Sequence, residues 1–313
     1  MIPIKDLTRI IVRQGKRSFL RFTKYHVKKS HQKKPGVYFV LDEKHFQKHP
    51  GLMDRMKAIV GVYYIAKENN MDFYLLHSAS FDLRKYLLPN NVSWKCEESD
   101  MSDSLFDTQV FQYNPYSEVP QLLDKNKQYH CFEYIGRNIL ELSYTPNWER
   151  LWKQYYDQLF TPSEHLKRMI TENRPAKHFV GVHVRFVNAL EMVEVSNVNS
   201  RLDDEKANEL VKQCTEAILQ IQEAEKKQVV VFSDSTYFLR HIENIGVLTL
   251  GVHNIEHISF TSNEEGVDRT FLDAYMLSEA DCIYAIQGNV LYASAFSKYA
   301  AIIGGKPYTV FNI

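Results

Sequence analysis

Short apolar runs alternate with helical stretches through the second half of the chain, and this alternation restricts the fold more than any other feature. The apolar runs lie at residues 179–184, 228–233, 247–250, 282–286 and 308–311. Stretches with helical spacing of apolar residues lie at 203–225, 236–241, 268–279 and 290–303. Alternating strands and helices build a parallel sheet with helices on both faces. The pattern predicts a doubly wound, Rossmann-like α/β domain.

The first half opens in a similar way. A strand is expected at 37–41, a helix after Gly51 and a second strand at 73–76, which together form a βαβ unit. Residues 82–135 show no pattern that assigns their elements.

Helical spacing returns at 148–170, where Pro162 is expected to divide two helices. A helix breaker follows at 173–175, and we place the domain boundary there. The predicted parts are a basic leader (1–34), an N-terminal domain (35–175) and a C-terminal domain (176–313).

The leader is basic, although the net charge of the 313-residue chain is zero. Residues 1–34 hold eleven Lys or Arg and one acid, with apolar residues at nearly helical spacing. Such a segment can lie on an anionic membrane surface, dock on the acidic remainder of the chain, or stay frayed. No apolar run approaches the roughly 20 residues of a membrane span. The four scattered cysteines indicate a reducing, cytoplasmic location. Membrane binding by the leader would place the protein at the cytoplasmic face of the inner membrane. No basic and aromatic stripe suggests a nucleic-acid partner.

Two polar side chains end the first strand of the C-terminal domain, in the segment HFVGVHVR (178–185). His183 and Arg185 are two positions apart, so they project from the same face of the strand end. A guanidinium suits a phosphate, although an ordinary surface ion pair is the simpler interpretation.

Small and polar residues follow two further strands at the same predicted edge of the sheet. These are Ser233 and Asp234 after one strand, and Gly288 and Asn289 after another. A small-residue turn into a helix can seat a phosphate on backbone N–H groups. Neither a GxGxxG motif nor a phosphate-binding loop of NTPases occurs, so we expect a nucleotide held in another way.

Taken together, VGVHVR, VVFSDS and FLDAYMLSEADCIYAIQGN resemble the three-block signature of the GT-B fucosyltransferase superfamily. This superfamily includes the α1,2-, α1,6- and protein O-fucosyltransferases. The third block is most similar to the α1,6 group, which includes bacterial nodulation fucosyltransferases. The segment GLMDRM, beginning at Gly51, resembles the N-terminal glycine loop of the same enzymes. The resemblance implies a GT-B fold, in which two Rossmann-like domains face a cleft.

The resemblance also implies roles for individual residues. Arg185 would bind the β-phosphate of GDP-fucose and stabilise the leaving group. His183 and Asp273 would contact the nucleoside, with Asp273 reading guanine, and Gly288 and Asn289 would contact phosphate. The family often has a second Arg where this chain has Phe186.

The catalytic base is not decided by the sequence. The α1,6 group places a Glu about ten residues after the motif His, and Glu191 and Glu194 flank that position, with Glu191 preferred. Asp54 in the glycine loop is a third candidate, and any of the three can be an unused acid. No metal or other cofactor is expected, because the chain has no D-x-D triplet and an arginine can supply the positive charge.

The resemblance thus implies an inverting transferase that moves L-fucose from GDP-fucose to a glycan or glycolipid hydroxyl, such as a bacterial surface polysaccharide or its lipid-linked precursor. The sequence is also compatible with two alternatives. One is a GT-B transferase for another nucleotide sugar. The other is a catalytically silent protein that binds a nucleotide sugar.

Overall fold

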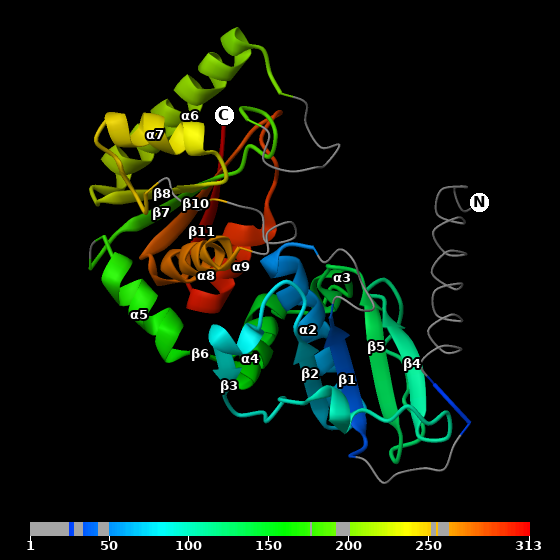
Figure 1. The fold of residues 1–313 in the computed structure, drawn as a ribbon. Coiled ribbons are helices and arrows are strands. Elements are labelled where there is room, and N and C mark those ends of the chain that lie inside the picture. The colour runs from blue at the N-terminus through cyan, green and yellow to red at the C-terminus, as the bar shows by residue number, and fades with distance from the viewer. Residues whose placement is uncertain are drawn as a thin grey trace, which may run out of the picture.

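Two parallel β-sheets, one from each half of the chain, lie on opposite sides of a layer of helices (Figure 1). The computed structural model describes residues 25–27, 34–42, 50–175, 177–191, 201–251, 255 and 263–313. Most of the basic leader lies outside these residues, so its membrane binding stays a prediction. Among the helices of the described ranges, none combines the length and hydropathy of a transmembrane segment.

The N-terminal sheet has the strand order β2-β1-β5-β4, and every pair in it is parallel. Its elements are β1 (Gly36–Leu41), α2 (Leu52–Glu68), β2 (Phe73–His77), β4 (Thr108–Tyr113) and β5 (Gln128–Tyr134). Every residue of β1 is buried, as expected of a central parallel strand. The predicted βαβ opening is therefore confirmed. The segment that the sequence left unassigned supplies the other two strands, together with η1 (Leu83–Lys85), β3 (Leu87–Pro89) and η2 (Glu98–Asp100).

The C-terminal sheet has the strand order β11-β10-β7-β8-β9, again entirely parallel. Its strands are β7 (Val180–Val184), β8 (Val229–Ser233), β9 (Leu248–Thr249), β10 (Cys282–Gln287) and β11 (Tyr308–Asn312). Its helices are α6 (Asp204–Glu225), α7 (Thr236–Asn244), α8 (Glu264–Glu279) and α9 (Ala295–Gly304). Helices α6 and α7 lie on one side of this sheet, and α8 and α9 on the side that faces the N-terminal half (Figure 1). The doubly wound α/β prediction is confirmed.

Two helices begin at residues other than those expected, because polar side chains cap them. Asn263 accepts the N–H of Glu265, so α8 begins one turn earlier than its apolar pattern suggests. Ser294 accepts the N–H of Phe296, so α9 begins about one turn later.

A connecting segment joins the two halves and packs on the C-terminal helices. It contains α3 (Ile139–Leu142), α4 (Trp148–Leu159), β6 (Phe160–Pro162) and α5 (Glu164–Asn173). The predicted division at Pro162 is confirmed, and the residues that divide the helices form β6, which pairs antiparallel with β3. Helix α4 packs on α9, and α5 packs on α8.

Aromatic contacts make the apolar core continuous between the two halves. The ring of Tyr86 stacks on that of Phe271 with 4.0 Å between their centroids, and the ring of Trp152 meets that of Tyr299 at 4.9 Å. Such pairs add about 0.5–1.5 kcal/mol each beyond their buried area. They hold the two sheets with their carboxyl ends beside one cavity.

Candidate active site

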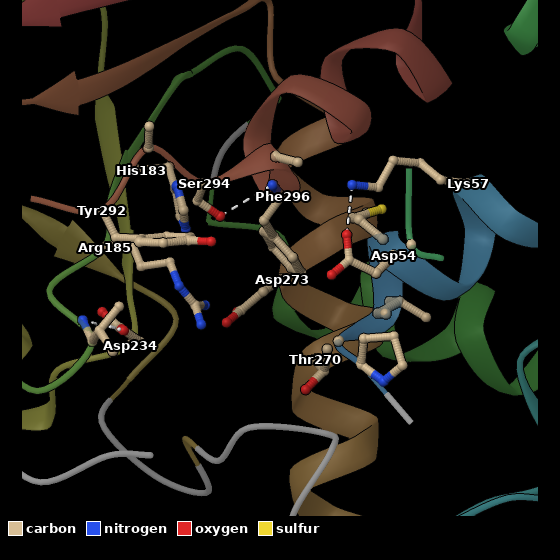
Figure 2. A pocket seen from close by; sticks show the side chains of 18 of the residues that line it. Asp54, Lys57, His183, Arg185, Asp234, Thr270, Asp273, Tyr292, Ser294 and Phe296 are labelled. Carbon is tan, nitrogen blue, oxygen red and sulfur yellow. Dashed lines mark hydrogen bonds and ion pairs between the residues drawn. The ribbon is translucent and has the colours of Figure 1, made fainter. Parts of the chain in front are cut away.

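A cavity of about 450 Å³ lies between the two halves (Figure 2). On the N-terminal side, Gly51, Asp54, Lys57, Gly136 and Arg137 line it. On the C-terminal side it is lined by His183, Arg185, Ser233, Asp234, Thr270, Asp273 and residues 292–296. Seven of the residues singled out in the sequence therefore meet at one place. Ligands of open α/β sheets bind at such carboxyl edges.

His183 and Arg185 enter the cavity together from β7 and the residue after it, as their spacing predicts. The His183 ring stacks on Phe296, with 5.6 Å between centroids. Burial, and to a lesser extent Arg185, lowers the pKa of His183 to about 3, so its imidazole is neutral at physiological pH. The Arg185 guanidinium lies 5.8 Å from the centre of the Tyr292 ring, which is cation–π geometry. Arg185 is thus a fixed cation beside a neutral imidazole.

Asp234 shapes the turn that follows Arg185. Its two carboxylate oxygens accept the backbone N–H groups of Phe186 and Val187, each at 2.8 Å. Val187 has a φ of 57°, which is strained for a β-branched residue. The Phe186 ring packs on Phe238 in the core, so it does not face the cavity. Asp234 lines the cavity, but both of its oxygens hold this turn.

Gly288 and Asn289, which the resemblance places at a phosphate, lie outside the lining of this cavity. Gly288 packs against Ile313. A turn separates β10 from α9, and within it the N–H of Tyr292 donates to the Arg185 carbonyl at 3.0 Å. The first turn of α9 and the residues before it line the cavity instead. The sequence pattern started this helix at residue 290, whereas α9 begins at Ala295.

Asp273 lines the cavity on α8, where Figure 2 shows its carboxylate pointing toward the same region as Arg185. Its Oδ1 accepts from Arg269 Nε at 2.7 Å, one helical turn earlier. Burial raises the pKa of Asp273, and Arg269 opposes this effect. Arg269 also donates to the carbonyl oxygens of Leu250 and Gly251, which fixes the pair.

Asp54 faces this group from the N-terminal half (Figure 2). Its Oδ1 lies 2.5 Å from Lys57 Nζ. Gly136 packs so closely that a Cβ atom at this position would lie 2.6 Å from the Asp54 Cβ. Neither Lys57 nor Gly136 was found from the sequence. Lys57 lies one helical turn after Asp54, a spacing that could have indicated it, whereas only tertiary contacts bring Gly136 to Asp54.

Glu191, the base that the sequence analysis preferred, lies at the start of α7 and is not among the cavity-lining residues. Its carboxylate accepts from the Ser235 and Thr236 hydroxyls, both at 2.9 Å, and from the N–H of Tyr237 at 3.1 Å. It therefore caps the N-terminus of α7 and does not line the cavity. Glu194 lies outside the described residues. Within the described ranges, no three His, Cys, Asp or Glu side chains converge in a group that could hold a metal ion.

Comparison with known proteins finds similarity at the level of the fold. No family model matches the chain, and no curated protein matches its sequence. Among solved structures, a mutant of Arabidopsis thaliana FUT1 in complex with GDP is similar, with a TM-score of 0.58 and 12% sequence identity. The match covers 95% of this chain and 74% of the other. The chain therefore has a GT-B-like α/β fold, with two parallel-sheet halves facing a shared cleft.

Proposed function

We propose that this protein is an inverting glycosyltransferase that moves L-fucose from GDP-fucose to a hydroxyl group of a glycan or glycolipid. One observation supports this most: the cavity sets His183, Arg185 and the start of α9 opposite the Asp54 carboxylate. The fold likeness to a GDP-bound FUT1 and the three-block sequence resemblance agree with it.

The C-terminal wall would hold the donor. Arg185 and the backbone N–H groups at the start of α9 would bind the diphosphate, because a fixed guanidinium and a helix N-terminus both favour anions. His183 and Asp273 would contact the nucleoside. Arg137 lines the opposite wall of the cavity and would supply a second guanidinium, in place of the Arg that the family often has at the position of Phe186. We propose on this basis that no divalent metal is needed.

Asp54 is the base in this proposal, replacing Glu191, because its carboxylate lines the cavity while that of Glu191 is bound to α7. The acceptor hydroxyl would give its proton to Asp54, and its oxygen would attack the anomeric carbon. The bond from this carbon to the β-phosphate oxygen would break, and Arg185 would take up the charge on GDP. A single displacement inverts the anomeric centre.

The acceptor and the location are proposed from the sequence alone. We propose a bacterial surface polysaccharide or its lipid-linked precursor, reached at the cytoplasmic face of the membrane with the help of residues 1–34. A transferase for another nucleotide sugar and a silent nucleotide-sugar-binding protein are the competing functions.

Isothermal titration with GDP, followed by GDP-fucose, GDP-mannose and UDP-glucose, tests the proposal. We expect GDP and GDP-fucose to bind more tightly than GDP-mannose and UDP-glucose. We also expect GDP-fucose to be slowly hydrolysed when no acceptor is present. Arg185→Ala should abolish binding and hydrolysis, while Arg168→Ala, at an exposed arginine of α5, should change neither. Binding without hydrolysis or transfer would support the silent protein. Absence of GDP binding would overturn the whole proposal.

A further inference from the structure

Lys57 is a buried lysine that the proposed reaction does not yet use. Its side chain is 5% exposed, whereas that of Asp54 is 42% exposed. The two residues are three positions apart on α2, which places them on one face of the helix. The ammonium group therefore lies beside a more exposed carboxylate, and both residues line the cavity.

The burial of this ammonium is better explained by a role in the site than by stability. Removing a charged amine from water costs several kcal/mol, and an ion pair recovers this cost only with very good geometry. A well-packed apolar side chain at such a position is often equally stable or more stable. Stability alone therefore gives little reason for a lysine here.

Contacts from both halves of the molecule hold Lys57 in place. Its Nζ lies 2.5 Å from Asp54 Oδ1 and 5.4 Å from the centre of the Tyr299 ring on α9. The Tyr299 hydroxyl is fixed in turn by Asn138 at 3.0 Å and Glu141 at 3.2 Å. The position of the ammonium thus depends on the same helix whose first turn faces the proposed diphosphate site.

The two oxygens of the Asp54 carboxylate have different surroundings. Oδ1 is bound by Lys57, while Oδ2 has no hydrogen-bond partner within the described residues. Gly136 closes the other side of the Asp54 side chain. One oxygen is therefore anchored, and the second is directed into the cavity, where an acceptor hydroxyl would approach.

We propose that Lys57 is a positioning residue for the transfer reaction, which anchors one oxygen of Asp54 so that the other can accept the proton of the acceptor hydroxyl. This inference rests on the proposed function, with Asp54 as the base. Lys57 would act through Asp54 and would make no contact with the donor phosphates.

The test is a double-mutant cycle with Lys57→Met and Asp54→Asn, measuring kcat for transfer and the Kd for GDP. Lys57→Met keeps the length of the side chain and should lower kcat by about 10- to 100-fold, the range expected when a reacting group is misplaced by about 1 Å. The Kd for GDP should stay within about twofold of wild type, since less than 0.5 kcal/mol is then lost. In the Asp54→Asn background, Lys57→Met should lower kcat no further. Lys57→Arg should restore most of the activity, because it keeps the charge.

Lys67→Met is the matched control, because Lys67 lies exposed on the same helix. It should leave kcat and the Kd unchanged. Wild-type kcat in Lys57→Met, an additive effect in the Asp54→Asn background, or an equal loss of GDP affinity would each overturn the role of Lys57 while the transferase function stands. A wild-type protein without transfer activity would instead overturn the proposed function, and the role of Lys57 with it.

Discussion

Asp234 on the loop after β8 and Val187 on the turn after β7 are joined by a 2.8 Å hydrogen bond, from the Val187 N–H to Asp234 Oδ2. The bond holds Val187 at a positive φ, and a second bond at 2.8 Å holds the N–H of Phe186. The two loops are thereby fixed to each other directly after Arg185. The orientation of Arg185, the residue proposed to bind phosphate, therefore depends on the Asp234 carboxylate, which follows the neighbouring strand.

Removing this carboxylate should cost both stability and binding. Asp234→Ala leaves two backbone N–H groups without their acceptor, and we expect the free energy of unfolding to fall by about 1–3 kcal/mol. The affinity for GDP should also fall, by about tenfold, because about 1.4 kcal/mol is lost when Arg185 is less well fixed. Urea denaturation and calorimetry measure the two effects. Asp157→Ala, at a surface ion pair with Lys153, is the control and should cost under about 1 kcal/mol. Unchanged GDP affinity in Asp234→Ala would argue against this coupling.

The buried imidazole of His183 should make stability depend on pH. Its pKa is lowered to about 3 in the folded protein, whereas an unfolded histidine titrates near 6.5. Between pH 3 and pH 6.5, protons bind the unfolded chain in preference to the folded protein. The contribution of His183 to the free energy of unfolding therefore has its full value above pH 6.5 and falls as the pH falls through this range. From pH 7 to pH 5 the wild-type protein should lose about 2 kcal/mol more stability than His183→Gln. Urea denaturation of both proteins at the two pH values measures this. Equal losses would show that His183 titrates normally.

Glu191 and Asp54 should respond differently to neutral substitution. Asp54→Asn should reduce transfer by about 100-fold or more, since general-base catalysis contributes roughly 10²- to 10⁴-fold. Glu191→Gln keeps an acceptor for the Thr236 and Ser235 hydroxyls, so it should retain most of the activity and lose at most about 1–3 kcal/mol of stability. Initial rates at saturating donor decide between the two residues. The opposite ranking would return the base to Glu191.

Gly136 should not tolerate a side chain. Its added Cβ would lie 2.6 Å from the Asp54 Cβ, a distance that forces the two residues apart. Gly136→Ala should therefore lower kcat by about tenfold or more through displacement of Asp54, the proposed base, with little change in the Kd for GDP. Kinetics and calorimetry on the same preparation measure both. Full activity in Gly136→Ala would show that Asp54 can shift without consequence.

Local sequence patterns determined much of the C-terminal half. Apolar runs, helical spacing and polar caps such as Asp203 act over a few residues, so they predict the element order without the tertiary structure. The two-residue period of a strand likewise places His183 and Arg185 on the same side. The strands of the unassigned segment escaped prediction, because their neighbours in the sheet come from distant parts of the chain.

The tertiary structure alone decided how the site is completed. Glu191 and Asp54 are both plausible bases by residue type, and only packing places one at the end of α7 and the other in the cavity. The contact of Gly136 with Asp54 and the burial of Lys57 against α9 join segments far apart in the chain. The sequence alone determines the chemistry of each side chain and the local spacing between residues. Which groups face each other across a cleft depends on how two separately built sheets are packed together.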